Sequence, residues 1–343
     1  MPDEVANSNN GASALAPRVT PSAIVRYLDQ YVVGQDEAKK TLAVAVYAHY
    51  RKVGRARGLA TTKSNVLLIG PTGTGKTLMC ETLSRVIGVP FVTADAPSLA
   101  QTEYVGDEIE AMLQRLVDKA GGDLEHAQRG IVFIDEVDKL KAVSSQSRGA
   151  SGEAVQNALL KIMEGVPVKL RNGHYLDTTN VLFICGGAFT GLDQILTRTH
   201  SFGFIATSED ENQKILDRLN ARVKPTDLFE FGLIPEFAGR LPVVTRLWEL
   251  SKPMLVRIVS EPRDAILRQF QEMFLAEGVE LVVEPAVFEQ IADLAIEYKI
   301  GARSLRGIFE EMITPALYVV PDRKDIRKVV FSSLFEEAGF VCT

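Results

Sequence analysis

A glycine-rich loop limits the possible folds more sharply than any other segment of this sequence. It follows the short apolar run 66–69 and reads Gly70-Pro71-Thr72-Gly73-Thr74-Gly75-Lys76-Thr77. This fits the pattern GxxxxGK[ST], in which glycines let backbone N–H groups converge on phosphate oxygens. Lys76 would place a positive charge beside the β- and γ-phosphates, and the Thr77 hydroxyl would ligate Mg²⁺. Since residues 77–86 read as a helix, the loop has the strand–loop–helix context of a nucleoside triphosphate site.

A second apolar run, 131–134, ends in two adjacent carboxylates, Asp135 and Glu136. Asp135 can hold the water shell of Mg²⁺. Glu136, on the other side of the pleat, can polarise an attacking water molecule. An acidic turn after a buried strand is common by itself. Beside a phosphate loop, however, the pair predicts hydrolysis, with Lys76 and Glu136 as catalytic residues.

Apolar runs and helical stretches alternate along the first two thirds of the chain. A third run, 181–184, repeats the pattern of the first two. Fully apolar strands that alternate with helices predict an α/β fold with a parallel sheet, whose ligands sit at the carboxyl ends of the strands. After residue 252 helical patterns prevail, with predicted helices over 254–277, 285–298 and 302–317. We therefore expect a disordered tail over 1–19, a large domain over 20–250, a smaller helical domain over 251–335 and a tail over 336–343.

Composition excludes several classes of protein. The 343 residues are 46% hydrophobic and 24% charged, as in a soluble globular chain. No apolar run is long enough to span a membrane, and residues 1–17 have no basic region followed by an apolar stretch, so we expect no secretory signal. The three cysteines are far apart, which excludes a disulfide framework or a CxxC zinc site and favours a reducing cytoplasm. A net charge of −6 argues against nucleic acid as the partner.

Several further segments resemble those of the AAA+ ATPases and, within them, of the ClpX protein unfoldases. The similarity extends over about residues 21–331. The resemblance implies an AAA+ P-loop NTPase sheet with a smaller, mostly helical C-terminal domain. It also implies ATP and Mg²⁺ as cofactors, and a homo-hexamer that threads unfolded or tagged proteins through a central pore. The segments that carry it are TPSAIVRYLDQYVVGQDEAKK, EYVGDEIE, FIDEVDKL, SGEAVQNALLKIMEG, LFICGGAFTGLD, FGLIPEFAGRLPVV and GARSLRGI.

The resemblance assigns nucleotide contacts beyond the phosphate loop. Val32 and Val33 lie where the family closes the base pocket, and Leu78 extends the nucleotide-binding segment. Arg240 matches the arginine finger that reaches a neighbouring subunit's γ-phosphate, which requires an oligomer. Arg303 matches the second-domain arginine that senses the same phosphate. A surface salt bridge is the alternative for Arg240, hydrophobic packing accompanies the role of the valines, and Arg306 is interpreted as structural.

The family's pore loop corresponds to Tyr104-Val105-Gly106, where an aromatic ring grips the translocated chain. An aromatic ring packs on almost any polypeptide, so such a grip tolerates sequence. Glu103 stands where the family usually has glycine, which should stiffen the loop and add charge. The alternative is a turn in which Tyr104 covers the sheet edge. A second pore loop corresponds to 166–177, for which a solvated hairpin is an equally good interpretation.

Two departures from the family concern its partners. No cysteine precedes Cys80, so we expect neither the family's N-terminal zinc-binding domain nor bound zinc. The family docks on the ClpP peptidase through an Ile-Gly-Phe loop, and here the corresponding residues are Phe202-Gly203-Phe204. Exposed phenylalanines favour docking, because a partner would cover them.

Four functions therefore stay open at this point. The first is a hexameric ATP-driven unfoldase, with or without ClpP. The second is a remodelling ATPase that acts without ClpP, which the missing zinc domain and the altered docking loop favour. The third is a nucleic-acid motor, against which the net charge and the aromatic pore loop argue. The fourth is a passive scaffold, which the intact Asp135, Glu136, Arg240 and Arg303 make the weakest.

Overall fold

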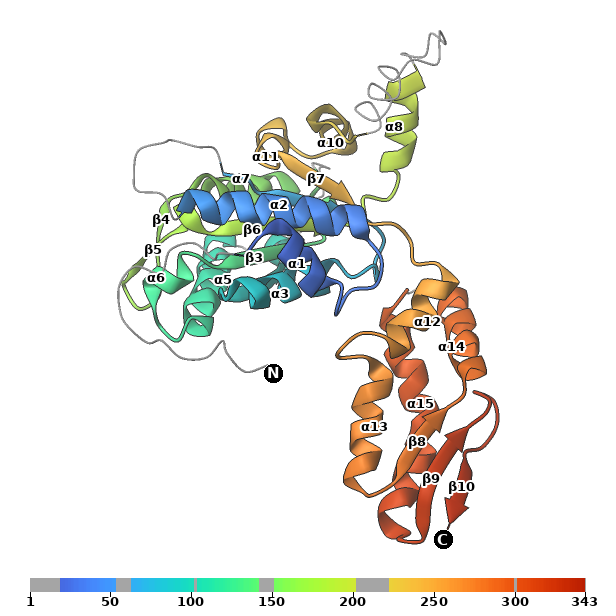
Figure 1. The fold of residues 1–343 in the computed structure, drawn as a ribbon. Helices are drawn as coiled ribbons and strands as arrows, with labels where there is room; N and C mark the ends of the chain where they lie inside the picture. The colour runs from blue at the N-terminus through green and yellow to red at the C-terminus, as the bar shows by residue number, and fades with distance from the viewer. Residues whose placement is uncertain are drawn as a thin grey trace.

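A parallel five-stranded sheet forms the centre of the N-terminal body (Figure 1). The computed structural model describes residues 19–53, 63–101, 104–141, 151–201, 222–298 and 301–342, with the side chains of 198–201 left out. The strand order is β2-β3-β6-β1-β7, which confirms the predicted α/β sheet. The strands are β1 (Val66–Ile69), β2 (Phe91–Asp95), β3 (Ile131–Asp135), β6 (Leu182–Gly187) and β7 (Val243–Arg246).

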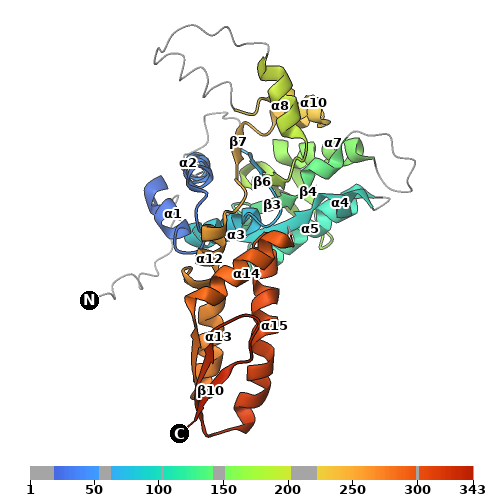
Figure 2. The same cartoon turned by 90° about the vertical axis from the view of Figure 1, so that its right-hand side faces the viewer.

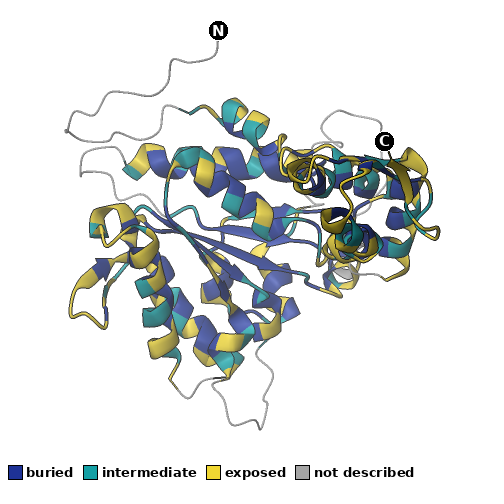
Figure 3. Cartoon of the chain, turned by 90° about the horizontal axis from the view of Figure 1, so that it is seen from below, coloured by how far each residue is buried: buried dark blue, intermediate teal, exposed yellow. Residues whose placement is uncertain are grey.

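Helices cover both faces of this sheet, which explains why its strands are continuously apolar. Val66 and Leu68 of β1 point to one face, which packs on α1 (Pro21–Leu28), α2 (Asp36–Val53) and α3 (Lys76–Ile87). Leu67 and Ile69 point to the other face. There they join a hydrophobic cluster with α5 (Val105–Lys119) and α7 (Gly152–Glu164). Figure 3 shows the buried strands between helices whose outer sides are exposed.

Shorter elements complete the N-terminal body. The Thr20 hydroxyl caps α1 by accepting a hydrogen bond from the backbone N–H of Ala23 (3.3 Å), and Pro21 is the first residue of this helix. Segment 166–177 forms the predicted hairpin. The shorter elements are α4 (Ala96–Ala100), α6 (Leu124–Ala127), η1 (Val137–Leu140), β4 (Pro167–Lys169), β5 (Tyr175–Asp177), η2 (Thr178–Asn180), α8 (Leu192–Ser201), α10 (Pro225–Phe231) and α11 (Pro235–Gly239).

The C-terminal body has a hydrophobic core of its own and extends below the first body in the view of Figure 2. Its core includes Leu250, whereas Leu247 belongs to the core of the first body. The strands form a sheet of order β10-β9-β8. The elements are α12 (Lys252–Ser260), α13 (Ile266–Ala276), β8 (Glu280–Val283), α14 (Pro285–Glu297), α15 (Arg303–Val319), η3 (Val320–Asp322), β9 (Ile326–Phe331) and β10 (Gly339–Cys342).

Two sequence-based expectations for this body need correction. The single helix expected over 254–277 divides into α12 and α13 around Pro262, because proline has no backbone N–H for the helical hydrogen bond and its ring clashes with the preceding turn. The expected tail over 336–343 contains β10, which pairs antiparallel with β9. This strand is stabilised by pairing with β9, so the local sequence of residues 336–343 is not enough to predict it.

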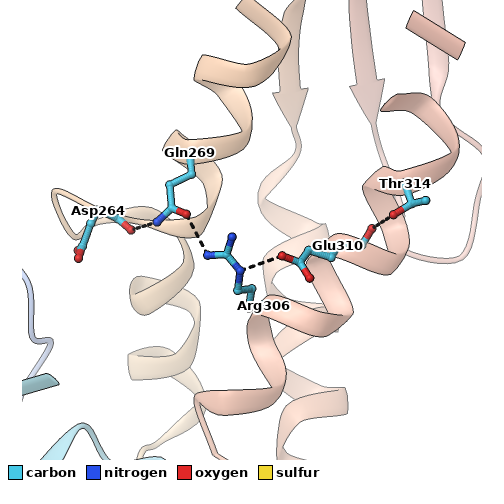
Figure 4. A network of polar contacts seen from close by, with 5 residues as sticks. All are labelled: Asp264, Gln269, Arg306, Glu310 and Thr314. Atoms are coloured by element: carbon cyan, nitrogen blue, oxygen red, sulfur yellow. Dashed lines mark hydrogen bonds and ion pairs between the residues drawn. The ribbon is translucent and has the colours of Figure 1, made fainter. Parts of the chain in front are cut away.

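Arg306 joins two helices of the C-terminal body (Figure 4). Its Nη1 donates to Oε1 of Gln269 on α13 (2.9 Å), and its Nε donates to Oε1 of Glu310 on α15 (2.8 Å). Gln269 in turn donates to the backbone carbonyl of Asp264 (2.7 Å). These contacts agree with the interpretation of Arg306 as a structural residue. Among the described residues, no helix is both long and apolar enough to cross a membrane.

Candidate active site

The glycine-rich loop is held in shape by its own polar groups. Gly73 and Gly75 have φ values of 81° and 95°, a left-handed conformation that side chains other than glycine rarely adopt. The ammonium of Lys76 donates to the carbonyls of Gly70 (2.6 Å) and Pro71 (3.0 Å). The Thr74 hydroxyl also donates to the carbonyl of Pro71 (2.8 Å). The loop therefore curls around the buried Lys76 at the start of α3.

The two predicted carboxylates lie at the end of β3, beside this loop. Oδ1 of Asp135 accepts a hydrogen bond from the backbone N–H of Glu136 (2.9 Å). Glu136 has a φ of 57°, a conformation that is costly for a residue with a side chain and that is often retained at functional sites. Burial lowers the pKa of Lys76, while the negative charge of Asp135 acts in the opposite direction. The ammonium of Lys76 and the carboxylates of Asp135 and Glu136 are therefore close enough for their charges to interact.

One cavity of about 440 Å³ brings most of the predicted nucleotide residues together. It combines a cation, a hydroxyl, carboxylates and a glycine loop, which is the set of groups that fits a triphosphate with Mg²⁺. Its lining also includes Arg303 from the C-terminal body. The lining residues are Thr72, Gly73, Gly75, Lys76, Thr77, Leu78, Asp135, Glu136, Asp138, Lys139, Ala188, Ala302 and Arg303.

The C-terminal body reaches this cavity through the start of α15. The backbone N–H of Ala302 donates to the carbonyl of Gly73 (3.4 Å). A Cβ at Gly301 would lie 3.1 Å from the carbonyl oxygen of Thr72, so the two backbones approach closely here. Arg303, the first residue of α15, follows directly. The structure therefore places Arg303 where the sequence analysis expects a second-domain arginine.

Asp138 is a site residue that the sequence analysis missed. It lies on η1, is 4% exposed and accepts hydrogen bonds from the backbone N–H groups of Ala188 and Phe189 (3.2 Å each). Phe189 has a φ of 52°, so the carboxylate holds a strained turn that follows β6. A Cβ at Gly187 would lie 2.5 Å from Oδ1 of Asp138. The only sequence signal was an acidic residue three positions after Asp135.

Val32 and Val33, the valines expected to close the base pocket, precede the phosphate loop in the sequence and lie near it in the structure. Val32 and Val33 are both buried and line a second cavity, of about 680 Å³, together with residues of the C-terminal body. Cγ1 of Val32 lies 4.0 Å from the Cβ position at Gly75, so this valine borders the phosphate loop. Packing and base-pocket roles are compatible for both valines.

Gln35, also missed from sequence, ties this segment to the chain between the two bodies. Its Nε2 donates to the carbonyl of Trp248 (2.8 Å), and its Oε1 accepts from the backbone N–H of Trp248 (2.9 Å). Gln35 is 7% exposed and has a φ of 60°. The base-pocket segment and the connection to the C-terminal body are therefore joined by a two-point hydrogen bond.

Arg240 is not among the described residues that line the phosphate-loop cavity of its own chain. It follows α11, and its guanidinium forms an ion pair with Glu164 at the end of α7 (2.6 Å). Its carbonyl accepts a hydrogen bond from Nδ2 of the buried Asn65 (3.1 Å). The side chain is half-exposed. The surface salt bridge that was the alternative role for Arg240 is therefore present within the monomer, as its ion pair with Glu164.

The remaining predicted residues have different outcomes. Tyr104 is 69% exposed, but Val105 and Gly106 form the first turn of α5 rather than a loop, which corrects that expectation. Phe202, Gly203 and Phe204, like Glu103, lie outside the described residues. Cys185, to which the sequence assigns no role, is buried on β6, and burial raises the pKa of its thiol to about 12.

Comparisons with known proteins agree with this geometry. Residues 61–244 match the family described as AAA domain (Cdc48 subfamily), which is more than half of the chain. Residues 250–330 match the family described as the C-terminal, D2-small domain, of ClpB protein. The first match ends at residue 244 and the second begins at residue 250, which is the first residue of the C-terminal hydrophobic core.

Three relatives carry nearly the same name. The ATP-dependent Clp protease ATP-binding subunit ClpX 3 of Methylococcus capsulatus is 45% identical over 341 residues, covering 90% of this chain and 78% of that protein. The ClpX subunits of Azotobacter vinelandii and Treponema denticola are each 43% identical. They cover 95% and 91% of this chain, and 80% of each relative.

Proposed function

The chain belongs to the ClpX family of AAA+ ATPases, and from this premise we propose that it is an ATP-driven protein unfoldase. In this proposal a homo-hexameric ring unfolds polypeptides and translocates them through a central pore. The observation that carries it is the cavity in which Lys76, Glu136 and Arg303 meet across two bodies. We further infer that residues 20–250 and 251–335 are the two units that move when nucleotide is hydrolysed.

The chain's own residues divide the hydrolytic work. Loop 70–77 and Leu78 would hold the triphosphate, with Lys76 beside its oxygens, and Val32 and Val33 would enclose the base. Thr77 and Asp135 would hold Mg²⁺, which neutralises charge on the phosphate oxygens when bound. Glu136 would orient the attacking water and accept its proton. Glu136 directly follows β3 and lines the same cavity as Lys76 and Thr77, which supports this role.

The ring would complete each site with a residue from the next subunit. Arg240 is half-exposed and lies outside its own subunit's cavity, which suits a guanidinium that acts on a neighbour's γ-phosphate. An arginine finger contributes roughly 10³–10⁵ to the rate. Arg303 would sense the same phosphate from the C-terminal body and so couple hydrolysis to the angle between the bodies.

The partners follow from the same proposal. Tyr104, exposed at the start of α5 with Val105 and Gly106, would grip the substrate chain. Phe202-Gly203-Phe204 would dock the ClpP peptidase, and the protein would work in the cytoplasm without zinc. The second candidate is a remodelling ATPase that acts without ClpP. The phenylalanine at position 202, where the family has isoleucine, favours it.

The test is ATP-dependent unfolding of a folded, tagged fluorescent reporter. We expect Glu136→Gln to bind ATP but to hydrolyse it poorly. Tyr104→Ala should hydrolyse ATP and fail to unfold the reporter. Tyr318→Ala is the matched control, because Tyr318 is also a largely exposed tyrosine but lies on α15, and it should unfold the reporter normally. Normal unfolding by Tyr104→Ala would refute the threading part of the proposal.

Added ClpP separates the two candidates. If the reporter is degraded and ClpP stimulates the ATPase, the protein serves a peptidase. If unfolding proceeds while no complex with ClpP forms, the remodelling function holds. Replacing Phe202 with alanine should abolish degradation only in the first case.

A further inference from the structure

Gln156 is a fully buried amide whose two polar ends bind backbone groups of two separate segments. It lies in the first half of α7 and is 0% exposed. Its Nε2 donates to the carbonyl of Leu140 (2.6 Å). Its Oε1 accepts from the backbone N–H of Ile234 (2.8 Å). A buried amide with good geometry at both ends fixes the distance between the groups that it joins.

The first of these segments follows the catalytic carboxylates. Leu140 is the last residue of η1, the turn that begins directly after Glu136 and carries Asp138. Helix α7 packs tightly against it, since a Cβ at Gly152 would lie 2.5 Å from the Leu140 carbonyl oxygen. A shift of α7 would therefore be transmitted to the segment that holds Glu136.

The second segment carries the proposed arginine finger. Ile234 is the N-cap of α11, and Arg240 follows the other end of this five-residue helix. Helix α7 contacts this segment twice, because its last residue, Glu164, forms the ion pair with the Arg240 guanidinium. Gln156 sets the start of α11, and Glu164 holds the side chain beyond its end.

We propose that Gln156 is a positioning residue that couples the two ATP sites to which one subunit contributes. Through Leu140 it is tied to the segment of Glu136, which serves the subunit's own site. Through Ile234 it is tied to Arg240, which serves the neighbour's site. The inference rests on the proposed function, because it requires Arg240 to act as a finger.

The experiment is a double-mutant cycle between Gln156 and Arg240 in the full chain. Gln156→Met keeps the side-chain length and removes both hydrogen bonds. We expect it to lower kcat for ATP hydrolysis about tenfold, while binding of a fluorescent ADP analogue changes less than twofold. We expect Arg240→Ala to lower kcat by two or more orders of magnitude. Adding Gln156→Met to Arg240→Ala should then have a clearly smaller effect than Gln156→Met alone, because the part of its effect that acts through Arg240 is already lost.

Thr178→Val is the matched control for loss of a buried hydrogen bond near α7. The Thr178 hydroxyl is 0% exposed and donates to the carbonyl of Ile162 on α7 (2.9 Å), and none of its hydrogen bonds to described residues goes to η1 or α11. Its effect on kcat should stay within about twofold in the presence and in the absence of Arg240.

A second variant keeps the test decisive if Gln156→Met does not fold. Gln156→Glu has the same shape, keeps the acceptor for Ile234 and loses the donor to Leu140. Burial raises the pKa of a carboxyl group, and its protonated form regains a donor. The kcat of this variant relative to wild type should therefore rise from pH 8 to pH 6.

The possible outcomes distinguish a failure of the finger role of Arg240 from a failure of the positioning role of Gln156. An unchanged kcat for Arg240→Ala would overturn the finger role and the inference with it. A normal Arg240 effect together with equal losses from Gln156→Met in both backgrounds would overturn only the role of Gln156. So would a normal kcat for Gln156→Met.

Discussion

Asp138 offers the sharpest test of how the strained turn beside the phosphate loop is held. Its two carboxylate oxygens accept from the backbone N–H groups of Ala188 and Phe189, at 3.2 Å each. Asp138→Asn preserves the shape, but it replaces one acceptor oxygen with an NH₂ group. That group would face a backbone N–H, so one hydrogen bond is lost and a buried donor is left without a partner.

The magnitude follows from the burial of the carboxylate. Hydrogen bonds to charged groups contribute about 1.5–3 kcal/mol. Both bonds here are at the long end of the usual range, which favours the lower part of that interval. We therefore expect the turn at Ala188 to lose about 2 kcal/mol of local stability, equivalent to roughly a 30-fold larger open population. Since Ala188 lines the phosphate-loop cavity, ATP binding should weaken as well.

Amide hydrogen exchange measures this local stability directly. Exchange of the amides of Ala188 and Phe189 should accelerate roughly 30-fold in Asp138→Asn, while amides within β3 and β6 keep their protection. Asp123→Asn is the matched control, because Asp123 caps the short helix α6 with one exposed hydrogen bond and asparagine caps equally well. Exchange at Ala188 and Phe189 within threefold of wild type would refute the assignment of this carboxylate as the holder of the turn.

Three further substitutions test other parts of the structure. Gly75→Ala should weaken ATP binding about tenfold, because a residue with a side chain adopts the left-handed φ of 95° only at a cost of about 1–2 kcal/mol. Gly88→Ala is the control: Gly88 has a φ of 74° at the end of α3, so its substitution should lower stability without changing ATP binding. Burial lowers the pKa of His49 to about 4, below its unfolded value of about 6.5, so its contribution to stability is complete above pH 6.5 and is lost as the pH falls towards 4. In urea titrations, the free energy of unfolding of His49→Gln should therefore fall less between pH 6.5 and pH 4 than that of the wild type, by up to about 3 kcal/mol. An equal dependence of the free energy of unfolding on pH in both proteins would contradict the burial argument. Gln35→Leu should make the peptide bonds around Trp248 more sensitive to limited proteolysis, and unchanged cleavage would show that the two-point hydrogen bond does not restrain this connection.

The local sequence was enough to predict the sheet and the phosphate loop. The strands at 66–69 and 131–134 are buried on both faces, so every residue of each strand is apolar and the run is visible in the sequence. The loop 70–77 is equally visible, because the left-handed backbone at Gly73 and Gly75 strongly favours glycine at these fixed positions. The wrong expectations concern pairing and boundaries. Strand β10 depends on its partner β9, and α5 begins at Val105, within the expected loop.

The sequence by itself therefore determined the class of fold, the nucleotide machinery and the family. Only the tertiary structure decided how these parts are connected, through Asp138, Gln35 and Gln156. Each of these side chains binds backbone N–H or carbonyl groups of a distant segment. Backbone groups are the same in every residue, so the partner leaves no mark in the sequence, and only the folded chain shows which segments meet.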